Sequence, residues 1–316
     1  MDGGRRSPGA LPLGAFAVAV TLGGANFLGV RFSNRELPPL WGAGLRFALA
    51  ATMFVVIAVV LGLRWPRGRQ LVLTVWYGAL SFALSYALLY WALVRVTAGV
   101  ATVVLAVVPL VTLLLAAAQG LERLRPRGAV GSVLALAGIT WMAVGPQDVD
   151  VPPTALWAML AAALAIGQSI ILGKRLAANH PAMTNAVGMT TGAVLLLAIS
   201  AAAGEQWALP RQAEALWAVV YLVTLGSVGL FVLVLLVVRR WTASATSYMF
   251  VLFPVVTMAL GAWVASEPVT AQGITGAALV MLGVWFGALS PGARRIAAPL
   301  PAHAPPPVTE TRSASS

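Results

Sequence analysis

The chain has 316 residues, of which 60% are hydrophobic and only 9% are charged, and its formal net charge is +11. A soluble domain carries about 25% charged residues, so this composition is typical of a membrane protein. The absence of cysteine excludes disulfides, zinc thiolates and cysteine nucleophiles. The two histidines, His180 and His303, fall in a predicted loop and in the C-terminal tail, which argues against a metal site.

Ten apolar runs are each long enough, or nearly so, to cross a hydrocarbon layer of about 30 Å, which takes roughly 20 helical residues. Five of them make a first half, at residues 11–30, 40–62, 71–94, 97–118 and 128–145. Five more make a second half, at residues 153–173, 183–203, 215–238, 243–264 and 270–289. Their length and their lack of strict alternation favour membrane helices over the strands of a barrel.

The sequence therefore predicts an all-α membrane protein of ten transmembrane helices. A short N-terminal segment, residues 1–10, precedes the first five-helix half at 11–145. The prolines of residues 146–152 separate this half from the second, at 153–289. After it the composition changes to Pro, Ala, Ser and Thr, and residues 290–316 are expected to form a disordered tail.

Basic residues set the expected orientation. If the N-terminus is cytoplasmic, 15 lysines and arginines lie on the inner side and 4 lie in outer loops. This asymmetry predicts that both termini are cytoplasmic, in a multi-pass protein of the inner membrane. The basic residues form short clusters between apolar runs rather than a stripe along one face. We therefore expect the lipid bilayer, and no nucleic acid, to be their partner.

One stretch occurs twice, at residues 95–145 and again at 240–290. A shift of 145 places aligns the copies without a gap, and 14 of the 51 positions are then identical. The identical pairs include Arg95/Arg240, Pro109/Pro254 and Glu122/Glu267. Because five spans per half is an odd number, the second half must enter the membrane from the opposite side. The halves thus form an inverted repeat, the construction that lets a central site open alternately to the two faces.

Short motifs spread along both halves carry a family resemblance. They are Gly24–Phe27, Glu36–Pro39, Leu45–Phe47, Val108–Pro109, Leu121–Leu124, Phe253–Pro254 and Ser266–Pro268. With ten spans and inverted halves, they make the chain resemble the EamA-like family of the drug/metabolite transporter superfamily. The resemblance implies an exporter of small metabolites, amino acids especially, that needs no cofactor and works on a small-molecule substrate. The alternative is a non-transporting membrane sensor or assembly protein on the same scaffold. The oligomeric state is not decided by the sequence, and a homodimer is one alternative.

The third span carries polar groups at helical spacing. Tyr77, Ser81 and Ser85 recur every four residues, as do Tyr86 and Tyr90. Under the offset of 145, Tyr86 aligns with Phe231 and Tyr90 with Leu235, so the halves share a scaffold but not these hydroxyls. Packing alone would not need that difference, and we infer that Tyr86 and Tyr90 line a substrate cavity. The alternative places Tyr90 in the outer aromatic belt.

Three further residues are expected in the substrate site. Asn26 and Gln168 fall at matching places when Pro39 is aligned with Pro181, an offset of 142. Amides at membrane depth need hydrogen bonds, so both should face inward, either to bind substrate or to hold helices together. Tyr248 in the ninth span is a weaker candidate from the second half.

Five residues are candidates for gating or structure. Pro109 and Pro254 each remove a backbone hydrogen bond and permit a bend, and a structural kink is the simpler explanation. Glu122 and Glu267 end the fourth and ninth spans, as gate residues or as interfacial charges, of which the second is favoured. Arg46 marks either a pathway in the bundle interior or a side chain that snorkels to the outer surface.

The acidic residues bear on coupling and on catalysis. All nine fall in predicted loops, tails or helix ends, so no carboxylate is expected at mid-membrane. A proton carrier of the kind found in pumps is then unsupported, and passive or weakly coupled movement is predicted. The chain lacks the catalytic groups of membrane enzymes that use paired acids, metals or an activated serine. It is therefore not expected to be an enzyme.

Overall fold

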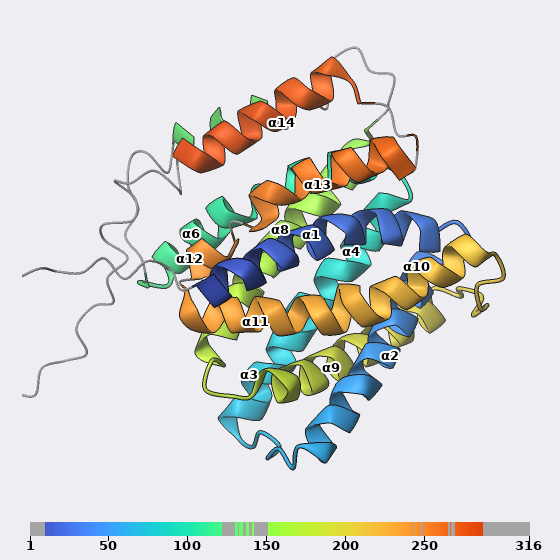
Figure 1. Cartoon of the computed structure of the whole chain (residues 1–316), viewed down its shortest axis with the longest axis vertical. Helices are drawn as coiled ribbons and strands as arrows, with labels where there is room; N and C mark the ends of the chain where they lie inside the picture. The colour runs from blue at the N-terminus through green and yellow to red at the C-terminus, as the bar shows by residue number, and fades with distance from the viewer. Residues whose placement is uncertain are drawn as a thin grey trace, which may run out of the picture.

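The computed structural model describes residues 10–121, 151–241, 243–247, 249–264 and 269–286, with Ser266 and seven residues between 130 and 141. Within these residues the secondary structure is helical throughout, without a strand, and the helices pack side by side as a bundle (Figure 1). Seven described helical segments are long and apolar enough to cross a membrane. The all-α membrane fold predicted from the sequence is therefore confirmed.

Four of the predicted spans in the first half are described. They correspond to α1 (Ala10–Ser33), α2 (Pro39–Val60), the run of α3 (Arg69–Gly78), η1 (Ala79–Leu84) and α4 (Ser85–Leu93), and the pair α5 (Ala98–Leu105) and α6 (Val108–Ala118). The fifth predicted span, 128–145, lies largely outside the described residues.

The second half repeats this order. Its helices are α8 (Pro153–Arg175), α9 (Pro181–Ala202), the run of α10 (Ala213–Val223), η2 (Thr224–Gly229) and α11 (Leu230–Arg240), then α12 (Ala243–Ser247), α13 (Met249–Val264) and α14 (Ala271–Val284). The ninth and tenth predicted spans contain shorter apolar helices. The count of ten membrane helices and the side on which the termini lie stay predictions.

Local sequence explains where several helices begin. Proline occupies the first residue of α2, α8 and α9, where its missing N–H would have no helical partner in any case. Thr97 and Thr270 cap α5 and α14, because their hydroxyls accept hydrogen bonds from the backbone N–H groups of Val100 and Gly273.

The helical runs α3–η1–α4 and α10–η2–α11 each contain a π-helical segment that the apolar pattern did not predict. In the first half it is η1, Ala79–Leu84, and in the second half it is η2, Thr224–Gly229. A shift of 145 residues superposes the two segments residue for residue. Because π-helical segments are rare and concentrate at functional sites, their presence at equivalent places in both halves indicates a functional site near them.

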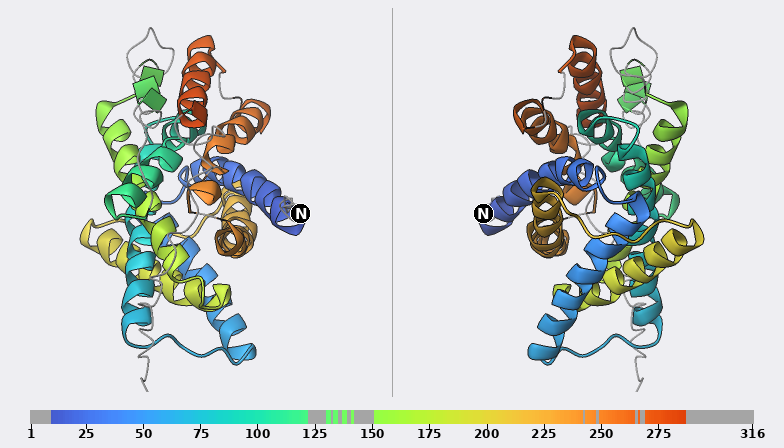
Figure 2. Two further views of the ribbon diagram at one scale, coloured as in Figure 1. Left: turned by 90° about the vertical axis from the view of Figure 1, so that its left-hand side faces the viewer. Right: turned by 90° about the vertical axis from the view of Figure 1, so that its right-hand side faces the viewer.

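The helices of the two halves pack against one another. α2 packs along α9, while α1 lies between α11 and α13 and contacts both (Figure 2). Close backbone approach is possible where glycines meet: a Cβ on Gly78 would lie 2.4 Å from the carbonyl oxygen of Gly188. Helices from both halves therefore alternate around one interior, as small residues at membrane helix contacts allow.

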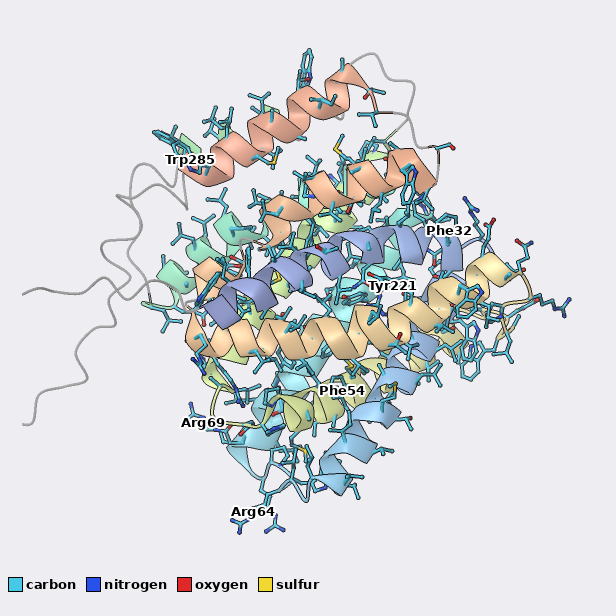
Figure 3. All side chains as sticks on the ribbon, in the orientation of Figure 1. Phe32, Phe54, Arg64, Arg69, Tyr221 and Trp285 are labelled. Atoms are coloured by element: carbon cyan, nitrogen blue, oxygen red, sulfur yellow. The ribbon has the colours of Figure 1, made fainter. Side chains whose placement is uncertain are left out.

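Large apolar side chains cover the outside of the bundle. Trp157, Trp217 and Trp263 are exposed by 71%, 69% and 81% of their surface. Arg64 and Arg69 lie at one end of the bundle, around the connection between α2 and α3 (Figure 3). An apolar surface of this extent suits lipid, since a water-soluble monomer exposes only small apolar patches.

Candidate functional site

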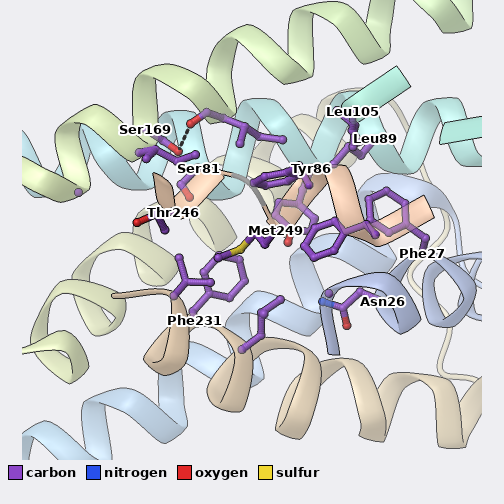
Figure 4. Close-up of a pocket in the computed structure, with 18 of the residues that line it drawn as sticks. Asn26, Phe27, Ser81, Tyr86, Leu89, Leu105, Ser169, Phe231, Thr246 and Met249 are labelled. Atoms are coloured by element: carbon purple, nitrogen blue, oxygen red, sulfur yellow. Dashed lines mark hydrogen bonds between the residues drawn. The ribbon is translucent and has the colours of Figure 1, made fainter. Parts of the chain in front are cut away.

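An internal cavity of about 90 Å³ lies between the two halves (Figure 4). It is lined by residues of α1, α2, α3, η1, α4 and α5 from the first half, and of α8, α11, α12 and α13 from the second. Most of the wall is aliphatic or phenylalanine. The polar groups that reach it come from Asn26, Arg46, Tyr77, Ser81, Tyr86, Tyr90, Ser169 and Thr246.

The cavity wall repeats with the offset of the sequence repeat. Five pairs of lining residues are 145 positions apart: Tyr86/Phe231, Leu89/Val234, Tyr90/Leu235, Leu93/Val238 and Leu105/Phe250. The cavity is therefore walled by equivalent positions of the two copies of the sequence repeat.

Helices α1 and α8 contribute the other repeated part of the wall, with a different offset. Gly23, Asn26, Phe27 and Val30 line the cavity from α1, and Ile166, Ser169, Ile170 and Gly173 line it from α8. Both sets follow the spacing i, i+3, i+4, i+7 of one helix face, and they differ by 143 positions rather than 142. Ser169, which the alignment of prolines missed, is thus the counterpart of Asn26. This face pattern in the sequence could have found it.

Gln168 is half-buried and outside the set of residues that lines the cavity. Its Oε1 accepts a hydrogen bond of 2.8 Å from Nε2 of Gln119, whose own Oε1 accepts one of 3.1 Å from Arg175. These contacts join α8 to the end of α6. The structure therefore places Gln168 in a contact between helices, one of the two roles that the sequence allowed.

Tyr86 and Tyr90 both line the cavity from α4. Tyr86 is half-buried and packs edge-on against Phe47, with ring centroids 4.7 Å apart. Only 1% of Tyr90 is exposed, so Tyr90 does not belong to an outer aromatic belt. Phenol rings in this position offer an apolar face together with a hydroxyl group.

Arg46 is buried in the same region, with 1% of its surface exposed, so of the two alternatives that the sequence left open, snorkelling to the outer surface is wrong. Its Nε donates to the hydroxyl of Ser227 at 2.8 Å and its Nη2 to the carbonyl oxygen of Gly226 at 2.8 Å. Its Nη1 lies 3.5 Å from the hydroxyl of Tyr90. Two of these partners belong to η2, so hydrogen bonds across the halves hold the guanidinium inside the bundle.

Asn26 reaches the same carbonyl group from α1. Its Nδ2 donates to the carbonyl oxygen of Gly226 at 2.9 Å. Its Oδ1 is buried and has no hydrogen-bond partner within the described part of the chain. A Cβ on Gly226 would overlap that oxygen, so a larger residue at this point of η2 would displace the Asn26 side chain. Asn26 therefore ties α1 to η2 at the cavity wall.

The remaining predicted positions contribute differently. Pro109 lies in the first turn of α6, just after the interruption at residues 106–107, whereas Pro254 lies inside the continuous helix α13. Tyr248, Glu122 and Glu267 fall outside the described residues. Among the described residues, no group of three or more His, Asp or Glu side chains gathers as a metal site would require.

One end of the bundle holds residues 33–41 and 203–214, which we call the Glu36 end. The carboxylate of Glu205 accepts hydrogen bonds from the backbone N–H groups of Leu40 and Trp41, at 3.2 and 2.7 Å. The carboxylate of Glu36 accepts from the N–H groups of Arg211 and Gln212, at 2.8 and 3.0 Å. Each half thus caps a helix start of the other, where the helix dipole favours negative charge.

Two further contacts close the Glu36 end. The rings of Trp41 and Trp207 stack with centroids 4.7 Å apart, and Arg35 pairs with Glu214 at 2.8 Å. At the opposite end the corresponding contact is apolar: Leu63, after α2, packs with Met183 and Val187 of α9. Polar contacts occur at this end as well, since Nζ of Lys174 donates to the carbonyl oxygens of Val238 and Trp241 at 2.9 and 2.8 Å.

Comparisons with known proteins were made on sequence and on structure. The model of the EamA-like transporter family matches residues 11–144 and 153–288, once in each half. An uncharacterized transporter of Archaeoglobus fulgidus is 28% identical over 273 residues, which cover 85% of this chain and 96% of that protein. The uncharacterized inner membrane transporter YedA of Escherichia coli (strain K12) is 29% identical over 260 residues, or 81% of this chain and 84% of YedA.

Two further similarities bear on the fold and on the kind of protein. A protein of Streptantibioticus cattleyicolor named "Probable terminal-alkyne amino-acid exporter" is 31% identical over 242 residues, which cover 76% of this chain and 80% of that protein. A solved crystal structure superposes with a TM-score of 0.65, covering 89% of this chain and 97% of that one. At 19% identity, that structure supports the fold alone.

Proposed function

Because the chain belongs to the EamA-like transporter family, we propose that it exports amino acids or related small metabolites by alternating access between its two repeats. It is a multi-pass membrane transporter of the inner membrane, like relatives that carry transporter names. The relatives' role is not enzymatic, and the partners that this role requires are a small solute and the surrounding lipid.

One observation carries the proposal: the cavity is walled by equivalent residues of both repeats. If one repeat rocks against the other, the cavity beside Tyr86 and Phe231 would open first to one side of the membrane and then to the other. A bound solute would not have to leave its site for this. The exporter name of the relative from Streptantibioticus cattleyicolor supports an amino acid as cargo. The largely apolar wall with a few polar groups supports a small amphiphilic solute.

The proposed orientation places the Glu36 end outside, because the count of basic residues puts both termini in the cytoplasm. The closing contacts of Glu36 and Glu205 would then form the outer barrier. Opening it exposes four backbone N–H groups that the two carboxylates now satisfy. Export would require this barrier to open while contacts at the opposite end, such as those of Lys174 with Val238 and Trp241, stay in place.

We propose passive or weakly coupled movement down the solute gradient. The described carboxylates, Glu36, Glu205 and Glu214, are engaged at the Glu36 end rather than at the cavity. A buried acidic proton carrier therefore has no candidate among them. Uphill accumulation driven by a pH gradient alone, in vesicles that hold the purified protein, would contradict this.

The test is efflux of a labelled panel of amino acids and metabolites from such vesicles, with Tyr86→Phe and Tyr90→Phe measured beside the unchanged protein. We expect at least one amino acid to leave, and either variant to slow it while remaining folded. If solutes move equally in all three proteins, transport stands and the two hydroxyls are not part of the site. If a ligand binds and nothing moves, the chain acts as a sensor on this scaffold.

A further inference from the structure

We propose that Arg46 binds the carboxylate of the transported solute, and that the cavity selects carboxylates with an apolar chain whether or not they carry an ammonium group. This deepens the proposed function, because it names the chemical class that the same cavity accepts. It rests on the position of a buried charge, its hydrogen bonds and the polarity of the wall around it.

The first step is the charge balance around Arg46. A guanidinium without a counter-ion is strongly destabilising inside a protein unless other groups compensate it. The three carboxylates that the structure describes are held at the Glu36 end, by backbone N–H groups or by Arg35. Within the described residues, Arg46 therefore has neutral dipoles and aromatic rings as its partners, and an anion in the cavity would supply the missing charge.

The second step is the geometry of its donors. A guanidinium has five N–H donors, of which Nε carries one and each terminal nitrogen carries two. Nε and Nη2 are committed to η2, whereas Nη1 reaches the hydroxyl of Tyr90 only at 3.5 Å, the long limit of a hydrogen bond. Nη1 is thus the part of the guanidinium that a ligand can engage.

The surrounding wall supplies the rest of such a site. Tyr86 and Tyr90 line the cavity next to Arg46, and the Cζ of Arg46 is 5.1 Å from the centre of the Tyr86 ring. Their hydroxyls can donate to a carboxylate, and hydrogen bonds to charged acceptors are the stronger ones. Phe231 and Leu235, which also line the cavity, offer an apolar surface that suits a hydrocarbon chain.

An ammonium group meets no charged partner among the described lining residues; the buried Oδ1 of Asn26 is a neutral acceptor for it. Among the described residues that line the cavity there is no carboxylate, and their polar side-chain groups are hydroxyls, an amide and the guanidinium. A bound cation would also lie close to Arg46, which repels it. The cavity therefore has the chemistry to require a carboxylate and to tolerate an ammonium group without requiring it.

The two halves carry this charge unequally. Pro39 and Pro181 both begin their helices, and the position seven residues after each is Arg46 in α2 and Gly188 in α9. A Cβ on Gly188 would lie 3.1 Å from both Tyr77 and Phe82, so the second half uses this place for packing. The described helices thus provide one anion-binding arginine for one solute.

The test measures binding to the purified full chain in detergent, with two matched sets of ligands. Each set has an amino acid, the acid without its amino group, the amine without its carboxyl group, and the amide. The first set is L-leucine, 4-methylpentanoate, 3-methylbutylamine and L-leucinamide. The second set is L-phenylalanine, 3-phenylpropanoate, 2-phenylethylamine and L-phenylalaninamide.

We expect both carboxylates of at least one set to bind, and its amine and amide to bind at least about tenfold more weakly, since a hydrogen bond to a charged group is lost. Arg46→Gln should abolish this preference, and Arg46→Lys should keep part of it because the charge remains. Arg64→Gln, the same substitution in the exposed connection after α2, is the matched control and should change nothing.

The proposal is overturned if the amine or the amide binds as tightly as the carboxylates, if no carboxylate binds, or if Arg46→Gln keeps the preference. Should the Arg46 variants fail to fold, the ligand sets still decide on the unchanged protein. Vesicle flux separates this idea from the transport proposal. If carboxylates bind but do not cross the vesicle membrane, only the transport proposal is contradicted. If solutes cross the membrane without any preference for a carboxylate, only the role of Arg46 is contradicted.

Discussion

Tyr86 and Phe231 are 145 positions apart in the sequence, and their rings line one cavity with centroids 6.4 Å apart. They are equivalent residues of the two repeats, and they differ by a single hydroxyl group. The repeats have therefore kept the shape of this wall and made its polarity unequal. At this pair of residues a solute meets a hydroxyl-bearing ring on one side and an apolar ring on the other.

Removing the hydroxyl of Tyr86 should weaken solute binding, while adding one opposite should not replace it. A buried hydrogen bond contributes about 0.5 to 1.5 kcal/mol, so Tyr86→Phe should raise the Kd about two- to tenfold. The double variant Tyr86→Phe with Phe231→Tyr restores the composition but places the hydroxyl away from Arg46. The Kd of the double variant should stay raised. Recovery of the original Kd would mean that the hydroxyl acts equally well from either wall of the cavity.

Loss of the Glu205 carboxylate should favour opening at the Glu36 end. Glu205→Gln weakens two hydrogen bonds to the first turn of α2, which are charge-assisted by the helix dipole. Because the chain has no cysteine, one cysteine placed at the lining residue Leu93 reports access to the cavity. An impermeant thiol reagent added outside should then label Leu93→Cys faster in the protein that also carries Glu205→Gln than in the protein that carries Leu93→Cys alone.

The matched control for this measurement is Glu214→Gln. Glu214 and Arg35 form an ion pair whose side chains are 65% and 53% exposed, and exposed pairs contribute little. The labelling rate should stay close to that of the parent. Equal acceleration by both substitutions would show that the Glu36 end responds to charge in general rather than to the helix cap of Glu205.

The crossing of α3 and α9 should not tolerate a methyl group at Gly78. A Cβ there would lie 2.4 Å from the carbonyl oxygen of Gly188, which is backbone and cannot rotate away. Overpacking of this kind destabilises by about 1 to 3 kcal/mol, so Gly78→Ala should lower the melting temperature in detergent. Gly14→Ala, in α1 with nothing within 4 Å of the added atom, should leave it unchanged or raise it slightly.

Pro109 should affect the rate of transport more than the affinity for the solute. α5 ends at Leu105 and α6 begins at Val108, so the helix axis is interrupted just before this proline. Alanine would supply the missing N–H and favour one continuous helix, which holds the bundle in a single arrangement. Pro109→Ala should therefore lower kcat for efflux and keep the Kd; a raised Kd with unchanged kcat would assign Pro109 to binding instead.

Hydropathy and the repeat were enough to predict much of the architecture. Every backbone polar group in lipid needs an internal partner, which leaves helices or a closed barrel, and apolar runs of about 20 residues without strict alternation favour helices. The offset of 145 residues, read from pairs such as Pro109 and Pro254, also relates the lining residues Tyr86 and Phe231. Tyr86, Tyr90 and Asn26 do line the cavity, since polar side chains on an apolar helix avoid lipid.

The rotation of each helix and the depth of each side chain came only from the tertiary structure. Composition does not distinguish a snorkelling arginine from a buried one, and it is the hydrogen bonds of Ser227 and Gly226 that hold Arg46 inside. The register of α1 against α8 likewise depends on packing, which puts Ser169 on the cavity wall and Gln168 beside Gln119. The π-helical segments leave no trace in the apolar pattern, because they change the hydrogen bonding of the backbone and not the residues that carry it.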